Sequence, residues 1–336
     1  MNFVATSLNT NPIDSESDLF LQEALSGLKQ HPKSLPSKYF YDAIGSRIFE
    51  EICELEEYYV TRTELNILHQ YRHEMAAYFD SEMTVIEPGA GAGIKVSILL
   101  EAMDKPKKFI PLEISCEAIS MSSLRLKQQH PTIEISPLQG DFTNTADLQR
   151  VAQLFNKDEK RLVFFPGSTL GNFSHPEALQ ILKNLKILAG NEGNILLGVD
   201  LIKDRNRLVA AYNDKQGVTA RFNLNLLARM NKELGSNFDL HQGFIHKAIF
   251  NEQYRRIEMH LVATRDQVVT LASERILFKK GETIHTENAH KYSVSEISRL
   301  SNTLDMTIQH YWQDNDQDFA LFLLTPIKHS AGKIGN

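Results

Sequence analysis

The chain has 336 residues, which at about 150 residues per domain suggests two domains. Hydrophobic residues make up 42% and charged residues 23% of the sequence, a balance that excludes a wholly disordered chain, a collagen-like repeat and a coiled coil. The formal net charge is −6 at pH 7. Proteins that neutralise nucleic-acid phosphates are usually basic, so we expect no nucleic-acid partner.

The first 200 residues begin with helices and then alternate strands with helices. Apolar residues at helical spacing predict helices at residues 17–29, 45–55 and 63–79. Short apolar runs predict strands at residues 83–87, 109–114, 133–138, 161–166 and 194–199. Helices are predicted between these strands at residues 96–103, 119–128 and 176–188. This alternation predicts an α/β fold, a Rossmann-like parallel sheet with helices on both faces.

The alternation stops after Asp200. Residues 201–240 are predicted to be mainly helical. The runs at 244–250, 254–263 and 267–271 predict strands that short turns join into a meander. A second module of α+β type is therefore expected after the sheet.

The final apolar stretch, residues 306–324, predicts a strand pair that closes one edge of the main sheet. Residues 1–57 are too few for a core of their own, so we expect them to pack with the second module. The predicted division is residues 58–200 plus 287–336 for the Rossmann-like domain, and residues 1–57 plus 201–286 for the second domain.

The two cysteines, Cys53 and Cys116, are too few for a disulfide framework or a four-thiolate zinc site, which favours a reducing, cytoplasmic setting. The N-terminal 20 residues lack the basic start and apolar core of a signal peptide. Without a run of 18 apolar residues, we expect no membrane span. His285 and His290 flank Glu287, but the spacing is not H-E-x-x-H and a third ligand is not evident, so we expect no metal site.

A glycine-rich loop follows the predicted strand at residues 83–87 and opens a helix. Its glycines, Gly89, Gly91 and Gly93, have the spacing G-x-G-x-G rather than the G-x-G-x-x-G of dinucleotide sites, and Glu87 precedes them. This variant suits a nucleoside cofactor without a pyrophosphate and with an amino-acid tail, such as S-adenosyl-L-methionine (SAM). Glycine-rich turns also occur in many folds that bind nothing.

Acidic residues follow two further strands. Glu113 lies 20 residues beyond Gly93, a position suited to binding both ribose hydroxyls. Asp141 and Phe142 could bind the adenine amino group and stack on the ring. Each acid alone could instead be a helix cap or a solvated carboxylate. Together with the loop, however, they favour a nucleoside cofactor at the carboxyl ends of the strands.

Seven further segments carry a family resemblance, among them Gly-Ser-Thr-Leu-Gly-Asn at 167–172. They lie at residues 39–49, 57–64, 167–172, 198–201, 211–223, 257–261 and 284–292. Together they resemble the histidine-specific Nα-methyltransferases that make trimethylhistidine (hercynine) on the route to ergothioneine, and the related fungal dimethylallyltryptophan N-methyltransferases. The resemblance covers residues 20–325. It implies a SAM-binding methyltransferase sheet, a separate substrate-binding domain and a small-molecule amino-acid substrate; we expect a monomer.

The resemblance also implies roles for individual residues. It implies cofactor binding by Gly89, Lys95, Glu113, Asp141 and Phe142, to which the glycine-rich loop itself adds Glu87 and Gly91. Substrate-binding positions are Tyr58, Asn172, Tyr212, Met259, Glu287 and Ala289. Asn172 and Tyr212 would hold the substrate's α-amino and carboxylate groups, Glu287 would bind the imidazole, and the catalytic set is Tyr41, Asn172 and Tyr212. Without the resemblance, Tyr58 and Met259 are interpreted as core residues, Asn172 as a turn residue and Glu287 as a surface acid.

One position departs from the family pattern. Histidine-binding members resemble T-E-x-S at the last motif, whereas this chain has Ala289 in place of the serine, with the loss of one imidazole hydrogen bond. L-Histidine remains the favoured acceptor, and tryptophan or another aromatic amino acid is the alternative. Two other classes are disfavoured. A NAD-dependent oxidoreductase needs the absent G-x-G-x-x-G spacing, and a catalytically silent cofactor-binding protein would not need Asn172 and Tyr212.

Overall fold

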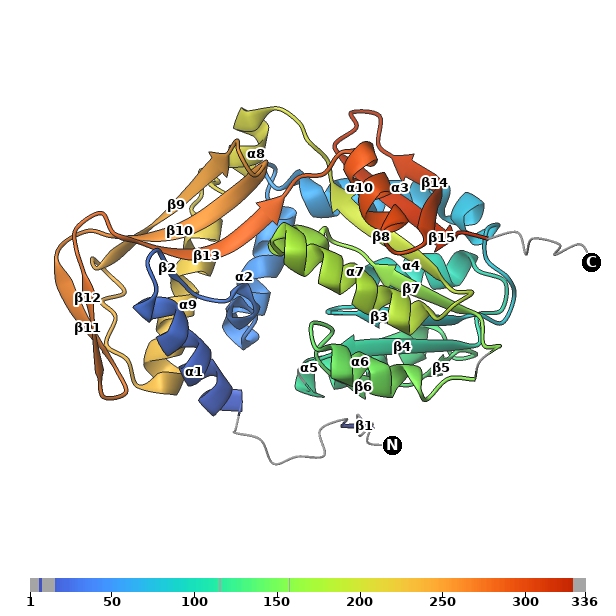
Figure 1. The fold of residues 1–336 in the computed structure, drawn as a ribbon, viewed down its shortest axis with the longest axis horizontal. Coiled ribbons are helices and arrows are strands. Elements are labelled where there is room, and N and C mark those ends of the chain that lie inside the picture. The colour runs from blue at the N-terminus through green and yellow to red at the C-terminus, as the bar shows by residue number, and fades with distance from the viewer. Residues whose placement is uncertain (1–5, 8–15, 115, 157, 329–336) are drawn as a thin grey trace, which may run out of the picture.

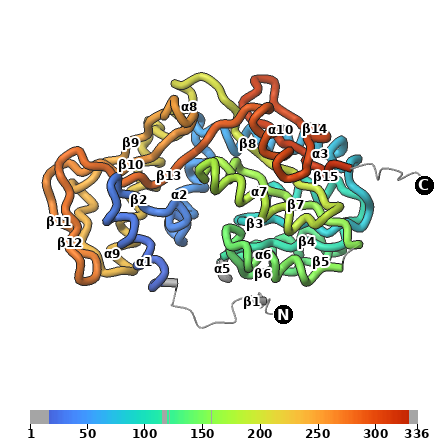
Figure 2. The backbone as a smooth tube through the Cα atoms, in the orientation of Figure 1, coloured from blue at the N-terminus to red at the C-terminus, as the bar shows by residue number. Residues whose placement is uncertain are grey.

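A computed structural model of the chain describes residues 6–7, 16–114, 116–156 and 158–328. It has two principal β-sheets, each with helices of its own. Figures 1 and 2 show the main sheet at the right of the view and the second sheet at the left. Segments from the beginning, middle and end of the sequence meet between them.

The main sheet is parallel over most of its width. Its strands are, in spatial order, β1 (Thr6–Ser7), β6 (Leu138–Gln139), β4 (Lys108–Glu113), β3 (Thr84–Pro88), β7 (Arg161–Phe165), β8 (Asn194–Asp200), β15 (Phe319–Pro326) and β14 (Met306–Gln313), with β5 (Glu134–Ile135) also pairing with β4. All pairs from β1 to β8 are parallel, whereas β15 is antiparallel to both β8 and β14. The predicted Rossmann-like sheet and the predicted C-terminal strand pair at its edge are therefore confirmed. The run predicted as one strand at 133–138 is two short strands, because Pro137 between them cannot donate to the ladder.

Helices cover both faces of the main sheet. Alternate strand residues enter two separate cores, as Val85 and Phe164 do on one face and Ile86 and Phe165 on the other. Helices α3 (Tyr59–Ala76) and α4 (Ile94–Ala102) pack on the first face, and α6 (Thr145–Ala152), α7 (His175–Ala189) and α10 (Val294–Asn302) on the second. Helix α5 (Cys116–Gln129) connects β4 to β5.

The second sheet combines the N-terminal segment with the region after the main sheet. Its strand order is β2 (Lys33–Ser34), β13 (Thr283–His290), β10 (Arg256–Ala263) and β9 (Phe244–Asn251). The accompanying helices are α1 (Glu16–Lys29), the 3-10 helix η1 (Ser37–Phe40), α2 (Ala43–Glu54), α8 (Arg205–Ala211) and α9 (Val218–Leu234). Phe40 stacks on Phe222 of α9 with 4.6 Å between ring centroids. Contacts of this kind confirm that the N-terminal segment packs with the later module.

The predicted meander is wrong beyond its first strand pair. Strand β10 pairs with β9 as expected, but its other neighbour is β13, while β11 (Gln267–Leu271) pairs with β12 (Glu274–Phe278) in a separate hairpin. The sequence of β13, T-I-H-T-E-N-A-H, hides a strand because it is mostly polar. The predicted boundary after residue 286 falls inside β13, which stays paired with β10 as far as His290. The division into two domains stays a prediction.

Candidate active site

Three glycines connect the end of β3 to the start of α4. Gly89, Gly91 and Gly93 have φ angles of +70°, +48° and +67°, in the left-handed region that glycine adopts without steric cost. A Cβ at Gly91 would meet nothing within 4 Å, and one at Gly89 would lie 3.5 Å from Cε1 of Phe142. Conformation, more than crowding, therefore explains the glycines at 89 and 91, and their exposed backbone can be approached closely.

Two acids stand beside this loop at neighbouring strand ends. The Glu113 carboxylate accepts hydrogen bonds from the backbone N–H groups of Ile114 at 2.9 Å and Gly91 at 3.5 Å. Burial raises the pKa of Glu113 despite these bonds. Asp141 accepts from the backbone N–H of Thr143 at 2.8 Å, so its carboxylate caps the turn after β6. The structure thus brings the predicted cofactor-binding acids to one edge of the sheet.

Glu87 is the least satisfied polar group of this edge. Only 2% of the residue is exposed, and among the described residues its Oε2 atom has no hydrogen-bond partner. Burial is the main reason why its pKa is raised well above the usual value, and the Glu64 and Glu113 carboxylates add to the effect. A buried carboxylate oxygen of this kind calls for a donor, preferably a cationic one.

Lys95, in the first turn of α4, is held by a buried acid from another helix. Its Nζ lies 2.5 Å from Oε2 of Glu64, a residue of α3 with no exposed surface. Both carboxylate oxygens of Glu64 also accept from the Gly167 backbone N–H at 2.9 Å. A Cβ at Gly198 would lie 2.3 Å from Glu64 Oε1, so this acid depends on the glycine in β8.

Three tyrosines from separate segments, Tyr41, Tyr58 and Tyr212, lie close enough to act electrostatically on one another. The rings of Tyr58, just before α3, and Tyr212, just after α8, meet edge to face with 6.0 Å between centroids. Both are buried, and burial raises the pKa of both hydroxyls. Tyr41, between η1 and α2, is more open, with 43% of its surface exposed, and its ring contacts Phe49. At neutral pH Tyr58 and Tyr212 are hydrogen-bond donors.

Glu287 of β13 lies near these tyrosines. Its carboxylate is close enough to act electrostatically on the hydroxyls of Tyr41, Tyr58 and Tyr212. Burial raises the pKa of Glu287 to about 8, although Lys291 opposes the shift. The structure therefore places a carboxyl group that is mainly protonated at neutral pH among three phenol groups.

The orientation of Glu287 depends on a β-bulge. Glu287 is the register partner of Met259 in β10, and the pairing skips Thr286 before it resumes. The Thr286 hydroxyl donates to Asn223 Oδ1 at 2.8 Å or to the carbonyl of Met259 at 3.1 Å. Ala289, two residues beyond Glu287, lies on the same face.

Asn172 ends the 3-10 helix η2 (Thr169–Asn172), which follows β7. Gly171 packs against the end of β13, where its carbonyl accepts from His290 Nδ1 at 3.0 Å and a Cβ would lie 2.9 Å from the His290 carbonyl oxygen. Asn172 is therefore carried by the main sheet but stands next to the strand that bears Glu287. The structure brings the two predicted groups of residues to adjoining edges of the two sheets.

Comparison with known proteins identifies the family. The family described as "Histidine-specific methyltransferase, SAM-dependent" matches residues 20–326. The chain belongs to this family. It is 36% identical over 315 residues to "Histidine N-alpha-methyltransferase" of Mycolicibacterium smegmatis (92% of this chain, 96% of the relative), and 34% identical over 307 residues to the protein of the same name from Mycobacterium tuberculosis (90% and 93%). "Ergothioneine biosynthesis protein 1" of Neurospora crassa is 30% identical over 311 residues, covering 91% of this chain and 35% of the fungal protein.

The residues of this methyltransferase fit the family's cofactor, SAM. The unpartnered Oε2 of Glu87 matches the need for an acceptor of the methionyl ammonium group. The exposed backbone of Gly89 and Gly91 leaves room for the ligand, with Phe142 beside it. Glu113 presents a carboxylate at the neighbouring strand end. The fit to SAM therefore depends on the Glu87 oxygen that has no partner among the described residues and on the open space beside Gly89 and Gly91.

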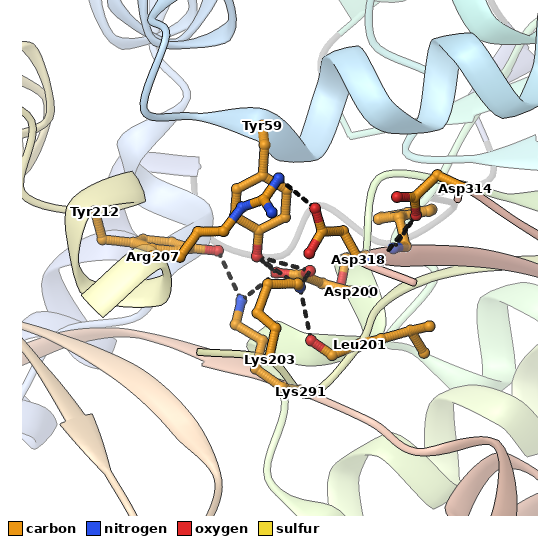
Figure 3. Close-up of polar contacts among 11 residues, drawn as sticks. Tyr59, Asp200, Leu201, Lys203, Arg207, Tyr212, Lys291, Asp314 and Asp318 are labelled. Atoms are coloured by element: carbon orange, nitrogen blue, oxygen red, sulfur yellow. Dashed lines mark hydrogen bonds and ion pairs between the residues drawn. The ribbon is translucent and has the colours of Figure 1, made fainter. Parts of the chain in front are cut away.

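A buried charge network around Asp200 joins the end of β8 to Lys291, which follows β13, and to Tyr212 (Figure 3). Asp200, at the end of β8, has no exposed surface and accepts a hydrogen bond from the Tyr59 hydroxyl at 2.9 Å. Lys291 Nζ lies 2.7 Å from Asp200 and 3.2 Å from the Tyr212 hydroxyl, and Lys203 forms a second ion pair with Asp200. Lys291 and Lys203 outweigh the burial of Asp200, so its pKa lies below the usual value.

Sequence reasoning assigned no role to Glu64 or Asp200, although both lie in the segments that carry the resemblance. A signal for Glu64 exists, because it occupies a core position of its helix, four residues after Val60 and three before Ile67. An acid at such a position needs a buried partner. Asp200 ends a continuous apolar strand, the same placement that pointed to Glu113.

Two further features of the described residues lie outside the site. The group that could hold a metal ion there is Asp314, Asp316 and Asp318. Two of its three carboxylates have other partners, since Asp314 accepts from the backbone N–H of Asp318 at 2.8 Å and Asp318 forms an ion pair with Arg207. Every helix in the part of the chain that the structure describes is too short or too polar to span a membrane.

Proposed function

We propose that this chain transfers methyl groups from SAM to the α-amino nitrogen of L-histidine and so makes Nα-trimethylhistidine, a step of ergothioneine biosynthesis. The observation that carries the proposal is the partly buried Glu287, whose carboxyl group acts electrostatically on the hydroxyls of Tyr41, Tyr58 and Tyr212, beside an edge suited to SAM. The names of the two most similar relatives reported above support the same reaction.

The proposed cofactor contacts come from one stretch of the main sheet. Glu87 and Lys95 bind the charged groups of the methionyl part, and the backbone of Gly89 and Gly91 lies along it. Glu113 binds the ribose hydroxyls, and the adenine lies by Asp141 and Phe142. When bound, SAM supplies a methyl group on a positively charged sulfur.

The proposed substrate contacts come from both sheets. Asn172 and Tyr212 bind the α-amino and carboxylate groups, because an amide both donates and accepts while a phenol donates to a carboxylate. Glu287 binds a ring N–H of the imidazole. Tyr58 offers an aromatic face to the quaternary ammonium that forms at the third transfer.

Proton loss from the amine does not need a strong base. The attacking nitrogen must be neutral; the α-amino group of a free amino acid is protonated in neutral water, and burial lowers its pKa. Burial raises the pKa values of Tyr41, Tyr58 and Tyr212 and so disfavours their phenolates, which means that none of the three is a strong base. Tyr41, which is open to solvent, can accept a hydrogen bond from the amine and relay its proton to water. Positioning then supplies most of the acceleration.

The remaining features of the substrate pocket concern the side chain of the amino acid. Met259, opposite Glu287, contributes an adaptable apolar wall, and Ala289 leaves space where a serine hydroxyl would bind the ring. A carboxyl group on this face favours a ring that donates an N–H. Tryptophan shares that property but is larger, so it is the comparison substrate for the test.

The proposal is tested by incubating the purified protein with SAM and each amino acid and weighing the products by mass spectrometry. With L-histidine we expect species that carry one, two and three additional methyl groups. With L-tryptophan we expect a rate at least about tenfold lower. The absence of any mass gain from histidine at saturating concentrations would contradict the proposal, and faster methylation of tryptophan would reassign the substrate.

The setting of the enzyme is part of the same proposal. We infer that it acts in the cytoplasm, in line with its low cysteine content, and that it is a monomer. We also infer that the main sheet with residues 58–200 plus 287–336 holds the cofactor, and that residues 1–57 plus 201–286 form the substrate-binding domain. Limited proteolysis and light scattering test these inferences.

A further inference from the structure

Lys291 is buried at the junction of the two sheets, immediately after β13. Its side chain is 1% exposed, and its Nζ lies between Asp200 Oδ2 at 2.7 Å and the Tyr212 hydroxyl at 3.2 Å. An ammonium group at such depth is strongly destabilised unless it is paired. Asp200 provides the pairing charge and holds the pKa of Lys291 above its usual value despite burial. Lys291 is therefore a fixed positive charge.

The direction of the Lys291–Tyr212 hydrogen bond is determined by chemistry. An ammonium group has three donors and no acceptor, so the Tyr212 oxygen accepts. The single proton of that hydroxyl must then point away from Lys291. Among the described residues the hydroxyl makes no other hydrogen bond, so its proton is available to a ligand.

Lys291 also changes the strength of Tyr212 as a donor. A hydroxyl that accepts a hydrogen bond from a cation is polarised and becomes a better donor. Lys291 Nζ additionally lies 4.8 Å from the centroid of the Tyr212 ring. At the other end of the residue, His246 Nε2 donates to the Tyr212 carbonyl at 2.9 Å, so the tyrosine is held at both ends.

We propose that Lys291 is a positioning residue that turns the Tyr212 hydroxyl proton toward the substrate and selects a negatively charged acceptor, the α-carboxylate of a free amino acid. This inference rests on the substrate contact of Tyr212 in the proposed function. A neutral amide in place of the carboxylate has the same shape but a weaker acceptor. The pair Lys291–Tyr212 therefore discriminates between free amino acids and amino-acid amides or peptide-linked residues.

The chain offers a matched control for Lys291. Lys203 is also buried and also pairs with Asp200, but it donates to the Tyr59 hydroxyl at 2.8 Å rather than to Tyr212. Lys291→Met and Lys203→Met each remove one of the two lysines that neutralise Asp200. A purely structural role predicts similar effects for the two variants.

The test measures kcat and KM of the wild type and both variants with L-histidine and with L-histidinamide. In the wild type we expect kcat/KM for histidine to exceed that for histidinamide by about tenfold or more, the size of one charged hydrogen bond. In Lys291→Met this ratio falls to about one, chiefly through a higher KM for histidine. In Lys203→Met the ratio stays at the wild-type value.

A double-variant cycle separates the inference from misfolding and from failure of the proposed function. In a Tyr212→Phe background, Lys291→Met should cause no further fall in the ratio, because the hydroxyl it orients is gone. Calorimetric binding of SAM reports whether each variant is folded. If the wild type methylates histidine but both lysine variants change the ratio equally, or if histidinamide is methylated as well as histidine, the inference is overturned while the proposed function stands. If the wild type methylates neither compound, the proposed function fails first.

Discussion

The two halves of the site are assembled in opposite ways. The proposed cofactor residues lie within residues 87–142, at or just after the ends of β3, β4 and β6. Much of this half of the site is formed by backbone groups, namely the glycine loop and the turns that Glu113 and Asp141 cap. The proposed substrate residues come from six separate segments between Tyr41 and Ala289, and side chains make up most of the half. A local stretch of sequence suffices for the first half, whereas only tertiary folding creates the second.

This difference predicts separable sensitivities. A change in the cofactor half should act through backbone conformation and alter SAM affinity alone. A change in the substrate half should act through the charge and hydrogen bonding of one side chain and alter histidine affinity alone. The Glu64–Lys95 and Asp200–Lys291 pairs are exceptions, because each links segments that are distant in the chain.

The largest effect is expected at Glu287. Glu287→Gln keeps the shape of the side chain but replaces the ionisable carboxyl group proposed to bind the imidazole with a neutral amide, so kcat/KM for histidine should fall by about one hundredfold. Steady-state kinetics measure this, and calorimetry should show unchanged SAM affinity. A parallel loss of SAM affinity would break the division between the two halves.

The same substitution should stabilise the ligand-free protein in alkaline solution. The folded pKa of Glu287 is raised to about 8, so between pH 4.5 and 8 the unfolded chain releases a proton that the folded chain retains. The contribution of Glu287 to folding stability therefore falls as pH rises through this window. Urea unfolding should show Glu287→Gln more stable than the wild type by up to about 5 kcal/mol at pH 8.5, with little difference at pH 4.5. Equal differences at both pH values would contradict the raised pKa.

In the cofactor half, Gly91→Ala should weaken SAM binding. Alanine at φ +48° costs about 1 kcal/mol in folding stability, and its methyl group enters the space left for the ligand. We expect about a tenfold loss of SAM affinity by calorimetry. Gly235→Ala is the matched control, because Gly235 also has a positive φ, +65°, and open space around its Cβ position, but ends α9 away from the site. It should lose similar stability and no SAM affinity.

The smallest effect is expected at Ala289. Ala289→Ser restores the hydroxyl that the family pattern places beside the imidazole, a hydrogen bond of about 1 kcal/mol. The KM for histidine should fall about fivefold, with kcat and SAM affinity unchanged. A rise in KM instead would show that the pocket is shaped around the alanine.

The cofactor half of the site could be predicted from the sequence more directly than the substrate half. The strands and helices of the main sheet are evident from continuous apolar runs, and the rule that ligands bind at strand ends points directly to Glu113 and Asp141. The mostly polar strand β13 carries no such pattern, so neither it nor its pairing with β10 was predicted. Tyr41, Tyr58, Asn172, Tyr212 and Glu287 were singled out through the family resemblance, because no local rule connects residues that meet only after folding.

The β-bulge at Thr286 has a consequence for how substrate preference can change in such an enzyme. In an uninterrupted ladder, odd and even positions keep to opposite sides, so Ile284 and Glu287 would point apart; the extra residue lets both turn the same way. The hydroxyl of Thr286 and the amide of Asn223 maintain this arrangement without reaching the amino acid that is methylated. A substitution at Thr286, which does not contact the substrate, can therefore change the preferred acceptor. Loss of the bulge would shift the register by one residue and turn Glu287 to the other face of the sheet, with every pocket residue still the same.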